Sequence, residues 1–331
     1  MTDHILEIGG MAIAPGKRQH LEIPVAQLPT RTTISLPVIA INGQFPGPRL
    51  WLSAAIHGDE INGVEIIRQV LERLKAKHLS GAVIAVPIVN VFGFIEQSRY
   101  LPDRRDLNRS FPGSAQGSLG SRLAHLFMTE IVHHSTHGID LHTAAQPRIN
   151  LPQIRANLAD AETYRCAQAF GAPLMIHATT RDGSLRQAAS KQGIPTLLYE
   201  TGEASRFDPD GIEIGVDGIL RVMDLLGMYA HPLANTQFTS LEITQTKWVR
   251  ASRSGLLHLE VKLGNKVEKK QRLGIITDAF GETMAKIRSP EQGVVIGHVQ
   301  NPLVNKGDAI VNLALISEKP TKEQKNHDSQ D

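Results

Sequence analysis

Hydrophobic positions along the chain follow two periods, each typical of a different element. Residues 50–56 and 82–91 are apolar runs of the kind found in buried strands. From Ile61 to Leu74, apolar residues recur every three or four positions, which indicates one face of a helix. We predict further helices over 119–131, 185–191 (capped by Ser184) and 212–228, and further strands over 139–141, 173–177 and 194–199. This alternation predicts an α/β fold with a mixed, mostly parallel sheet flanked by helices.

The two ends of the chain have a different pattern from its middle. Residues 1–48 combine Val, Ile and Thr with turn dipeptides, which predicts a β-rich segment that opens a large domain spanning 1–235. Over 245–317 the helical period gives way to short apolar strands separated by Gly or Asn turns, so we predict a small all-β domain. The charged stretch 318–331 has no period and is predicted to be a disordered tail.

Composition narrows the class of protein. With 331 residues, 41% of them hydrophobic and 21% charged, the chain can bury a large core. A formal charge of +2 and an aromatic share of 5% argue against a nucleic-acid partner. No apolar run reaches the ~18 residues of a membrane span and no signal peptide is found, which predicts a cytoplasmic protein without a membrane partner. The single cysteine, Cys166, excludes an internal disulfide.

The first motif that carries chemistry is His57-Gly58-Asp59-Glu60, where an apolar strand ends and a helix begins. An imidazole and a carboxylate three residues apart suit Zn²⁺, whose third ligand is then expected from a distant segment. His142, just after the strand 139–141, is the candidate, because the carboxyl ends of parallel strands meet at one edge of a sheet. The alternative is an ordinary helix start, with Asp59 and Glu60 complementing the helix dipole, and a hydrogen-bonded core histidine at 142.

A second group of histidines, His133, His134 and His137, lies at the end of a predicted helix. Histidines there complement the C-terminal helix dipole. We expect no acidic or cysteine partner beside them, so a metal site is not predicted at this position.

Residues 99–113 form a polar segment with few signals of helix or strand. Its arginines and Asn108 could hold a substrate carboxylate through paired hydrogen bonds; the arginines are Arg99, Arg104, Arg105 and Arg109. The alternative is a solvated, salt-bridged surface loop, which is the more frequent meaning of such a segment.

Glu200 follows the predicted strand 194–199, which would deliver its carboxylate to the edge of the sheet. Hydrolysis of an amide by zinc-bound water needs a carboxylate that is not a ligand, to take the proton of the water and pass it to the leaving nitrogen. Glu203 is the competing candidate for this general base, and either residue could instead cap the next segment.

Taken together, residues 45–230 resemble the succinylglutamate desuccinylase and aspartoacylase family, whose catalytic domain is similar to zinc carboxypeptidases. The resemblance rests on four motifs in order: HGDE at 57–60, DLNRSF at 106–111, DLH at 140–142 and ETG at 200–202. It implies one Zn²⁺ per chain held by His57, Glu60 and His142, with Glu200 as the catalytic base. It also implies that Asn108 and Arg109 bind a substrate carboxylate, and that Arg99 polarises the scissile carbonyl, with Arg104 as the alternative.

The C-terminal module resembles the barrel-sandwich fold of biotinyl and lipoyl carrier domains. The stretch 278–282, which matches the carrier hairpin tip, has no lysine to modify, so we interpret the module as a wall of the active site or as a contact in a homo-oligomer. The family resemblance implies a zinc-dependent amidohydrolase that deacylates a small acidic N-acyl amino acid or related amine. A carboxypeptidase-like peptidase is the alternative enzyme, and a non-catalytic zinc or small-molecule binding protein is the alternative outside enzymes.

Overall fold

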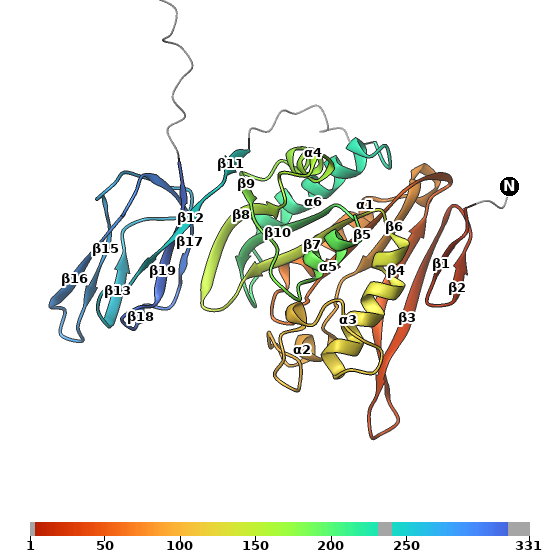
Figure 1. The fold of residues 1–331 in the computed structure, drawn as a ribbon, viewed down its shortest axis with the longest axis horizontal. Helices are drawn as coiled ribbons and strands as arrows, with labels where there is room; N and C mark the ends of the chain where they lie inside the picture. Colours follow the sequence, from red (N-terminus) through yellow and green to blue (C-terminus); the bar gives the residue numbers. More distant parts are fainter. Residues whose placement is uncertain (1–3, 231–239, 317–331) are drawn as a thin grey trace, which may run out of the picture. The chain divides into compact units, whose positions relative to one another are not determined.

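The computed structural model describes residues 4–230 and 240–316, which form two compact units (Figure 1). The first unit comprises the described residues up to 244 together with 297–301, and the second comprises 245–296 and the described residues from 302 onward. The predicted boundary at 235 and the predicted tail 318–331 fall outside the described residues.

A mixed sheet forms the centre of the first unit, as the sequence predicted. Its strands lie in the order β3 (Lys17–Gln27), β4 (Thr33–Asn42), β6 (Ser80–Val86), β5 (Phe45–Ala54), β7 (His137–Ala144), β10 (Thr196–Glu203), β8 (Arg148–Ala156), β9 (Leu174–His177) and β11 (Leu241–Ile243). Strands β6, β5, β7 and β10 are mutually parallel, while β3, β4 and β8 each join a neighbour in antiparallel fashion. A separate hairpin, β1 (Leu6–Ile8) and β2 (Met11–Ile13), precedes this sheet.

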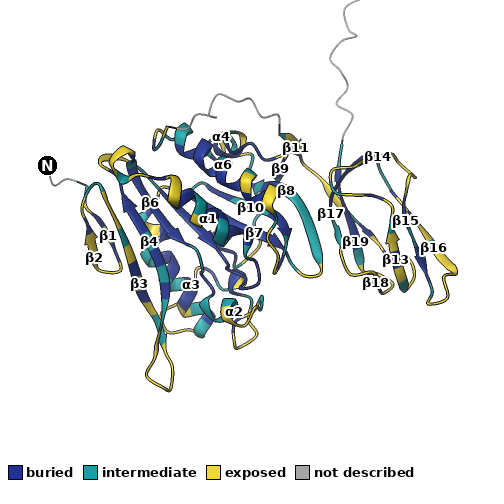
Figure 2. Ribbon diagram, turned by 180° about the vertical axis from the view of Figure 1, so that it is seen from behind, coloured by how far each residue is buried: buried dark blue, intermediate teal, exposed yellow. Residues whose placement is uncertain are grey.

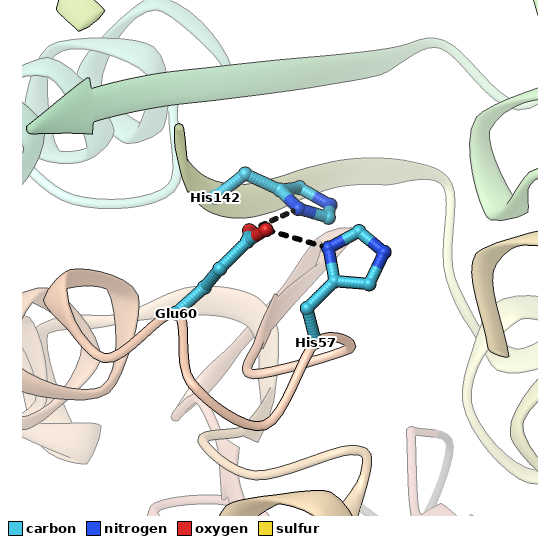
Figure 3. Close-up of side chains that lie close together, drawn as sticks. All are labelled: His57, Glu60 and His142. Carbon is cyan, nitrogen blue, oxygen red and sulfur yellow. Dashed lines mark hydrogen bonds and ion pairs between the residues drawn. The ribbon is translucent and has the colours of Figure 1, made fainter. Parts of the chain in front are cut away.

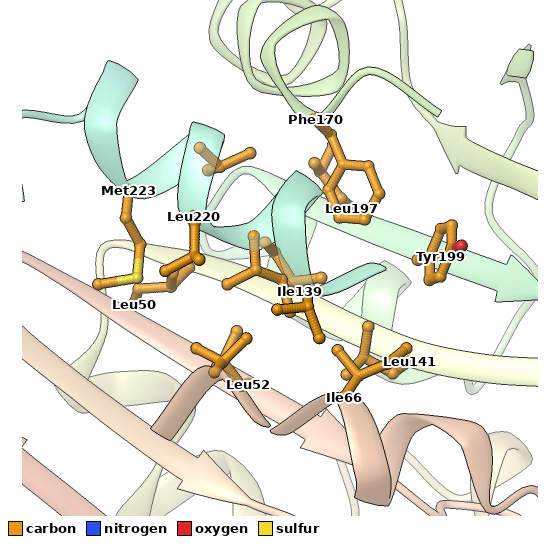
Figure 4. Close-up of a cluster of buried hydrophobic side chains, with 14 of the residues drawn as sticks. Leu50, Leu52, Ile66, Ile139, Leu141, Phe170, Leu197, Tyr199, Leu220 and Met223 are labelled. Atoms are coloured by element: carbon orange, nitrogen blue, oxygen red, sulfur yellow. The ribbon is translucent and has the colours of Figure 1, made fainter. Parts of the chain in front are cut away.

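Helices cover both faces of the central strands, which are mostly buried beneath them (Figure 2). One face packs against α1 (Asn62–Arg73), α4 (Ala161–Phe170) and α6 (Pro209–Leu225), and the other against α3 (Leu119–Glu130) and α5 (Leu185–Lys191). The period of two along β5 explains the division, because Leu50 and Leu52 enter the first cluster (Figure 4) while Trp51 enters the second. Ser184 caps α5 by accepting from the Gln187 N–H, as predicted.

Strand β8 and helix α4 were missed by the hydrophobic pattern. In β8, Pro152 lies within the strand and most of the other residues are half-buried, so no clear period of two is visible. Helix α4 is capped by Asp160 and ends at Gly171, whose φ of 70° suits glycine. The predicted strand 82–91 is shorter in the structure and ends at Val86, because Pro87 follows and has no N–H for the ladder.

The second unit is all-β, as predicted. A four-stranded antiparallel sheet has the order β16 (Thr283–Arg288), β15 (Arg272–Thr277), β13 (Gly255–Leu259) and β18 (Leu303–Val304). The remaining strands are β12 (Thr246–Arg250), β14 (Lys266–Val267), β17 (Gly293–Val299) and β19 (Ala309–Leu315). Within the part of the chain that the structure describes, no helix is long and apolar enough to cross a membrane.

Candidate metal centre

The loop that joins β5 to α1 carries His57 and Glu60, and β7 carries His142. Because β5 and β7 are parallel neighbours, with Ala54 opposite Leu141, the loop lies beside the carboxyl end of β7. Gly58 permits this placement, since a Cβ there would lie 1.9 Å from the carbonyl carbon of Gly93 in the short helix α2 (Val91–Ile95). The local backbone therefore brings the HGDE motif to the end of the strand.

Three side chains converge on one point in this region, as Figure 3 shows. The Nδ1 atoms of His57 and His142 lie 2.7 Å from Glu60 Oε1 and Oε2, respectively. One ligand atom of each residue lies within 4.8 Å of the others, and none of the three residues is more than 5% exposed. The structure thus brings together the three residues that the sequence singled out, and they could hold a metal ion.

Two further carboxylates bind the outer nitrogens of the imidazoles. His57 Nε2 lies 3.1 Å from Asp106 Oδ1, and His142 Nε2 lies 2.8 Å from Asp140 Oδ2. When Nε2–H donates outward, the Nδ1 lone pair is available to an ion, which is the tautomer that a metal ligand needs; without the ion, Nδ1 donates to Glu60. Two imidazole nitrogens and one carboxylate oxygen form the donor set that Zn²⁺ takes in catalytic sites, where the fourth position stays open. The residues present fit this ion.

The charged groups around His57, Glu60 and His142 shift one another's pKa values. Burial raises the pKa of Glu60, but the adjacent His57 and His142 lower it more, so that its pKa lies well below its usual range. Burial lowers the pKa of His142, but Asp140 and Glu60 outweigh it and the net pKa is raised. Burial also raises the pKa of Asp106, and His57 and Arg99 again reverse the direction. Glu60 and Asp106 are therefore ionised and attract positive charge to the imidazoles and to the space between them.

Arg99 belongs to the cluster, whereas Arg104 does not. Arg99 Nη1 lies 3.2 Å from both Glu60 Oε1 and His57 Nδ1, and its Nη2 donates to Asp106 Oδ2 at 2.9 Å. Arg104 is exposed, at a left-handed φ of 61°, and forms no hydrogen bond with these residues. Of the two arginines left open by the sequence, the structure places Arg99 at the candidate centre.

Asn108 and Arg109 lie in the turn that follows Asp106. Asn108 Oδ1 accepts from the Leu185 N–H at 2.9 Å, at the first residue of α5, and Arg109 is exposed with Nη1 donating to the Asn108 carbonyl. The side-chain oxygen of Asn108 is thus already hydrogen-bonded within the protein, whereas its side-chain NH₂ group can donate to a ligand.

Glu200 lies on β10 directly opposite His142 of β7, next to the cluster. Its Oε2 accepts hydrogen bonds from Asn150 and Gln153 of β8. Glu203 instead pairs with Arg206 at 3.0 Å. Between the two glutamates, Gly202 adopts a φ of 68°, and a Cβ there would lie 2.7 Å from Asn62 Nδ2, so the third position of the ETG motif requires glycine.

The second histidine group is not brought together as a unit. His133 contacts Gln192, whereas His137 lies 3.3 Å from Glu162 and close to Cys166, both on α4. The expectation that no acidic or cysteine partner lies nearby is wrong, because α4 was not predicted. Glu162 also accepts two hydrogen bonds from Arg165, and burial raises the pKa of the Cys166 thiol to about 12, so this group is satisfied without an ion.

The roles of five polar residues around the centre were not predicted from the sequence: Ser53, Asp106, Asp140, Asn150 and Gln153. Asp140 had a usable signal, because it precedes His142 by two positions on the same face of β7. Asn150 and Gln153 had none, since their strand was not predicted.

A buried His–Glu–His group at the carboxyl ends of parallel strands is typical of metal-dependent α/β enzymes. The family model of the succinylglutamate desuccinylase/aspartoacylase catalytic domain matches residues 46–226, more than half of the chain. The chain belongs to this family, whose named members are deacylases.

Individual relatives agree with this membership. The chain is 28% identical over 298 residues to an N-alpha-acetyl-L-2,4-diaminobutyric acid deacetylase from Halomonas elongata, a match that covers 86% of this chain and 87% of the relative. The product-bound ectoine utilization protein EutE (DoeB) from Ruegeria pomeroyi superposes with a TM-score of 0.82 at 22% identity, covering 92% and 98% of the two chains. A succinylglutamate desuccinylase/aspartoacylase from Rhodobacter sphaeroides gives a TM-score of 0.81 at 26% identity, with the same coverage. Over the part of the chain that these structures cover, the fold is that of the family.

Proposed function

We propose that this protein is a zinc-dependent deacylase that cleaves the amide of an N-acyl amino acid or a related small amine. The observation that carries the proposal is the convergence of His57, Glu60 and His142 beside Glu200, a carboxylate that does not belong to the group of three. Metal-assisted amide hydrolysis needs one set of residues that holds the ion and a separate residue that acts as the base.

His57, Glu60 and His142 would hold one Zn²⁺ per chain. When bound, the ion acts as a Lewis acid and lowers the pKa of a water molecule towards ~7. Asp106 and Asp140 keep both imidazoles in the ligand tautomer by accepting from their Nε2 atoms. These outer contacts also hold the rings in place before any ion binds.

Glu200 takes the proton of the attacking water on its carboxylate and then gives it to the nitrogen of the departing amine. Arg99, whose guanidinium lies at the centre, donates hydrogen bonds to the carbonyl oxygen as negative charge develops there. A carboxylic acid and a free amine are the products. The contacts of Arg99 with His57 and Glu60, and the position of Glu200 opposite His142, support these roles.

The substrate class follows from the NH₂ of Asn108 and the guanidinium of Arg109, which can bind a carboxylate. The Halomonas relative is named for an N-acyl amino acid substrate, which supports the same class here. We infer that the substrate is a small acidic N-acyl compound.

The test is amine release from a panel of N-acetyl, N-succinyl and other N-acyl amino acids by the zinc-loaded protein. We expect turnover of one acyl class, and loss of at least about 100-fold in kcat for Glu200→Gln with the zinc content unchanged. Normal turnover by Glu200→Gln would remove Glu200 as the base. An inactive wild-type protein with one zinc bound would contradict the deacylase itself.

A further inference from the structure

The carboxylate of Glu200 is held from one side by two amide side chains of strand β8. Asn150 Nδ2 donates to Glu200 Oε2 at 2.7 Å, and Gln153 Nε2 donates to the same oxygen at 3.3 Å. Over residues 4–230 and 240–316, no hydrogen bond to Oε1 is found. We propose that Asn150 and Gln153 are positioning residues that fix Glu200 by Oε2 and reserve Oε1 for the proton. The proposal rests on the function proposed above, in which Glu200 is the base.

A β-bulge makes this arrangement possible. Residues three positions apart face opposite sides of a regular strand, so Asn150 and Gln153 could not both reach one oxygen from an ideal β8. The pairing with β10 places Gln153 opposite Glu200 and Asn150 opposite Gly202, so that three steps along β8 match two along β10. The extra residue falls in the Leu151-Pro152 stretch, where proline has no N–H to lose from the ladder. The bulge thus turns both amides towards the base.

Neutral amide donors suit a group that must gain and lose a proton. The terminal torsion of a glutamate is soft, and two donors on one oxygen fix the plane of the carboxylate and therefore the direction of the other oxygen. When Oε1 is protonated, Oε2 becomes the carbonyl oxygen of the acid and still accepts both hydrogen bonds. An arginine or lysine in place of the amides would favour the ionised form and oppose proton uptake. The two amides can therefore hold Glu200 in both states.

Gln153 also has a buried side-chain oxygen that does not stabilise the fold. It is 1% exposed, and its Oε1 has no hydrogen-bond partner within the described part of the chain. A buried polar atom without a partner destabilises a fold, so a glutamine is disfavoured here unless its NH₂ group is needed. The hydrogen bond from that NH₂ group to Glu200 gives a functional reason for a glutamine at position 153.

The experiment measures kcat, KM and zinc content for variants of the full-length, zinc-loaded protein on the substrate that the panel identifies. Asn150→Ala and Gln153→Met should each lower kcat by about 10-fold or more, with KM within about twofold and one zinc still bound. Asn150→Asp conserves size but removes the donor, so its kcat should fall below that of Asn150→Ala. Asn157→Ala removes an exposed amide just beyond β8 and should match the wild type.

The outcomes separate positioning from packing. Gln153→Met should melt at the same temperature as the wild type or higher, because it removes the unpaired oxygen. A kcat for Asn150→Asp above that of Asn150→Ala would mean that the side chain only fills space, and would overturn the proposal. Full kcat in Asn150→Ala and Gln153→Met, beside an inactive Glu200→Gln, would refute the positioning role and leave the proposed function intact. Normal activity of Glu200→Gln would refute both.

A crystal structure provides a readout that needs no turnover. In the Asn150→Ala/Gln153→Met double variant, the Glu200 carboxylate should adopt more than one orientation, whereas the wild type should show one. A single, unchanged orientation in the double variant would contradict the proposal even if no substrate were known.

Discussion

Strand β7 carries a histidine group near each of its ends, and the two groups differ in charge. Near the carboxyl end, His57 and His142 contact three carboxylates and one guanidinium. When both imidazoles are neutral, the net charge of these groups is minus two. The groups are Glu60, Asp106, Asp140 and Arg99. A divalent cation would neutralise this net negative charge.

At the amino end, His137 meets Glu162 and Cys166, but Arg165 already compensates the charge of Glu162. The side chain of Glu162 is also 35% exposed, whereas that of Glu60 is 2% exposed. A divalent ion would therefore bring uncompensated charge to the amino end, and would have to displace a proton from a thiol that holds it tightly. Ligand atoms at suitable distances occur at both ends, but only one end has the charge that a metal ion requires.

The largest expected effect is the loss of the metal ion itself. His142→Ala removes one of three ligands and should lower zinc affinity by more than about 100-fold, leaving little zinc after dialysis. The matched variant His137→Ala, at the other end of the same strand, should retain one zinc per chain. Elemental analysis and competition with a chromophoric chelator measure both, and an unchanged stoichiometry in His142→Ala would remove it from the ligand set.

A smaller effect is expected from the carboxylate behind the ligand. Asp140→Asn keeps the shape but weakens the acceptor for His142 Nε2, so zinc affinity should fall by about 10- to 100-fold. Glu162→Gln makes the same chemical change beside His137 and should leave zinc affinity unaltered. Equal effects of the two substitutions would show that charge balance does not distinguish the two ends.

The smallest expected effect concerns the thiol at the amino end. Burial raises the pKa of Cys166 from 9.0 to about 12, so its folded form holds the proton more tightly than its unfolded form. The protonated thiol therefore contributes fully to the free energy of unfolding below pH 9, and this contribution is lost as the pH rises towards about 12. Alkylation at pH 8 should be much slower in the native protein than in urea. Rapid native alkylation, or a sulfur-to-cobalt charge-transfer band in cobalt-loaded protein, would contradict this description.

Much of the fold could be predicted from local pattern because its signals are local. The helix α1 follows from apolar spacing over 61–74, and the start of α5 from the cap at Ser184. The strand β8 could not be predicted, since Pro152 and the bulge remove its period of two. Without β8, Asn150 and Gln153 could not be predicted, and without α4 the partners of His137 could not be predicted.

The sequence by itself determined which residue types stand at the ends of the apolar strands, and so which histidines and glutamates could serve as ligands or base. Only the tertiary structure decided which of them meet. It placed Arg99 beside Glu60, Glu200 opposite His142 and Glu203 beside Arg206. The physical reason is that strand register and bulges depend on pairing between segments far apart in the chain, and this pairing sets which side chains share one face.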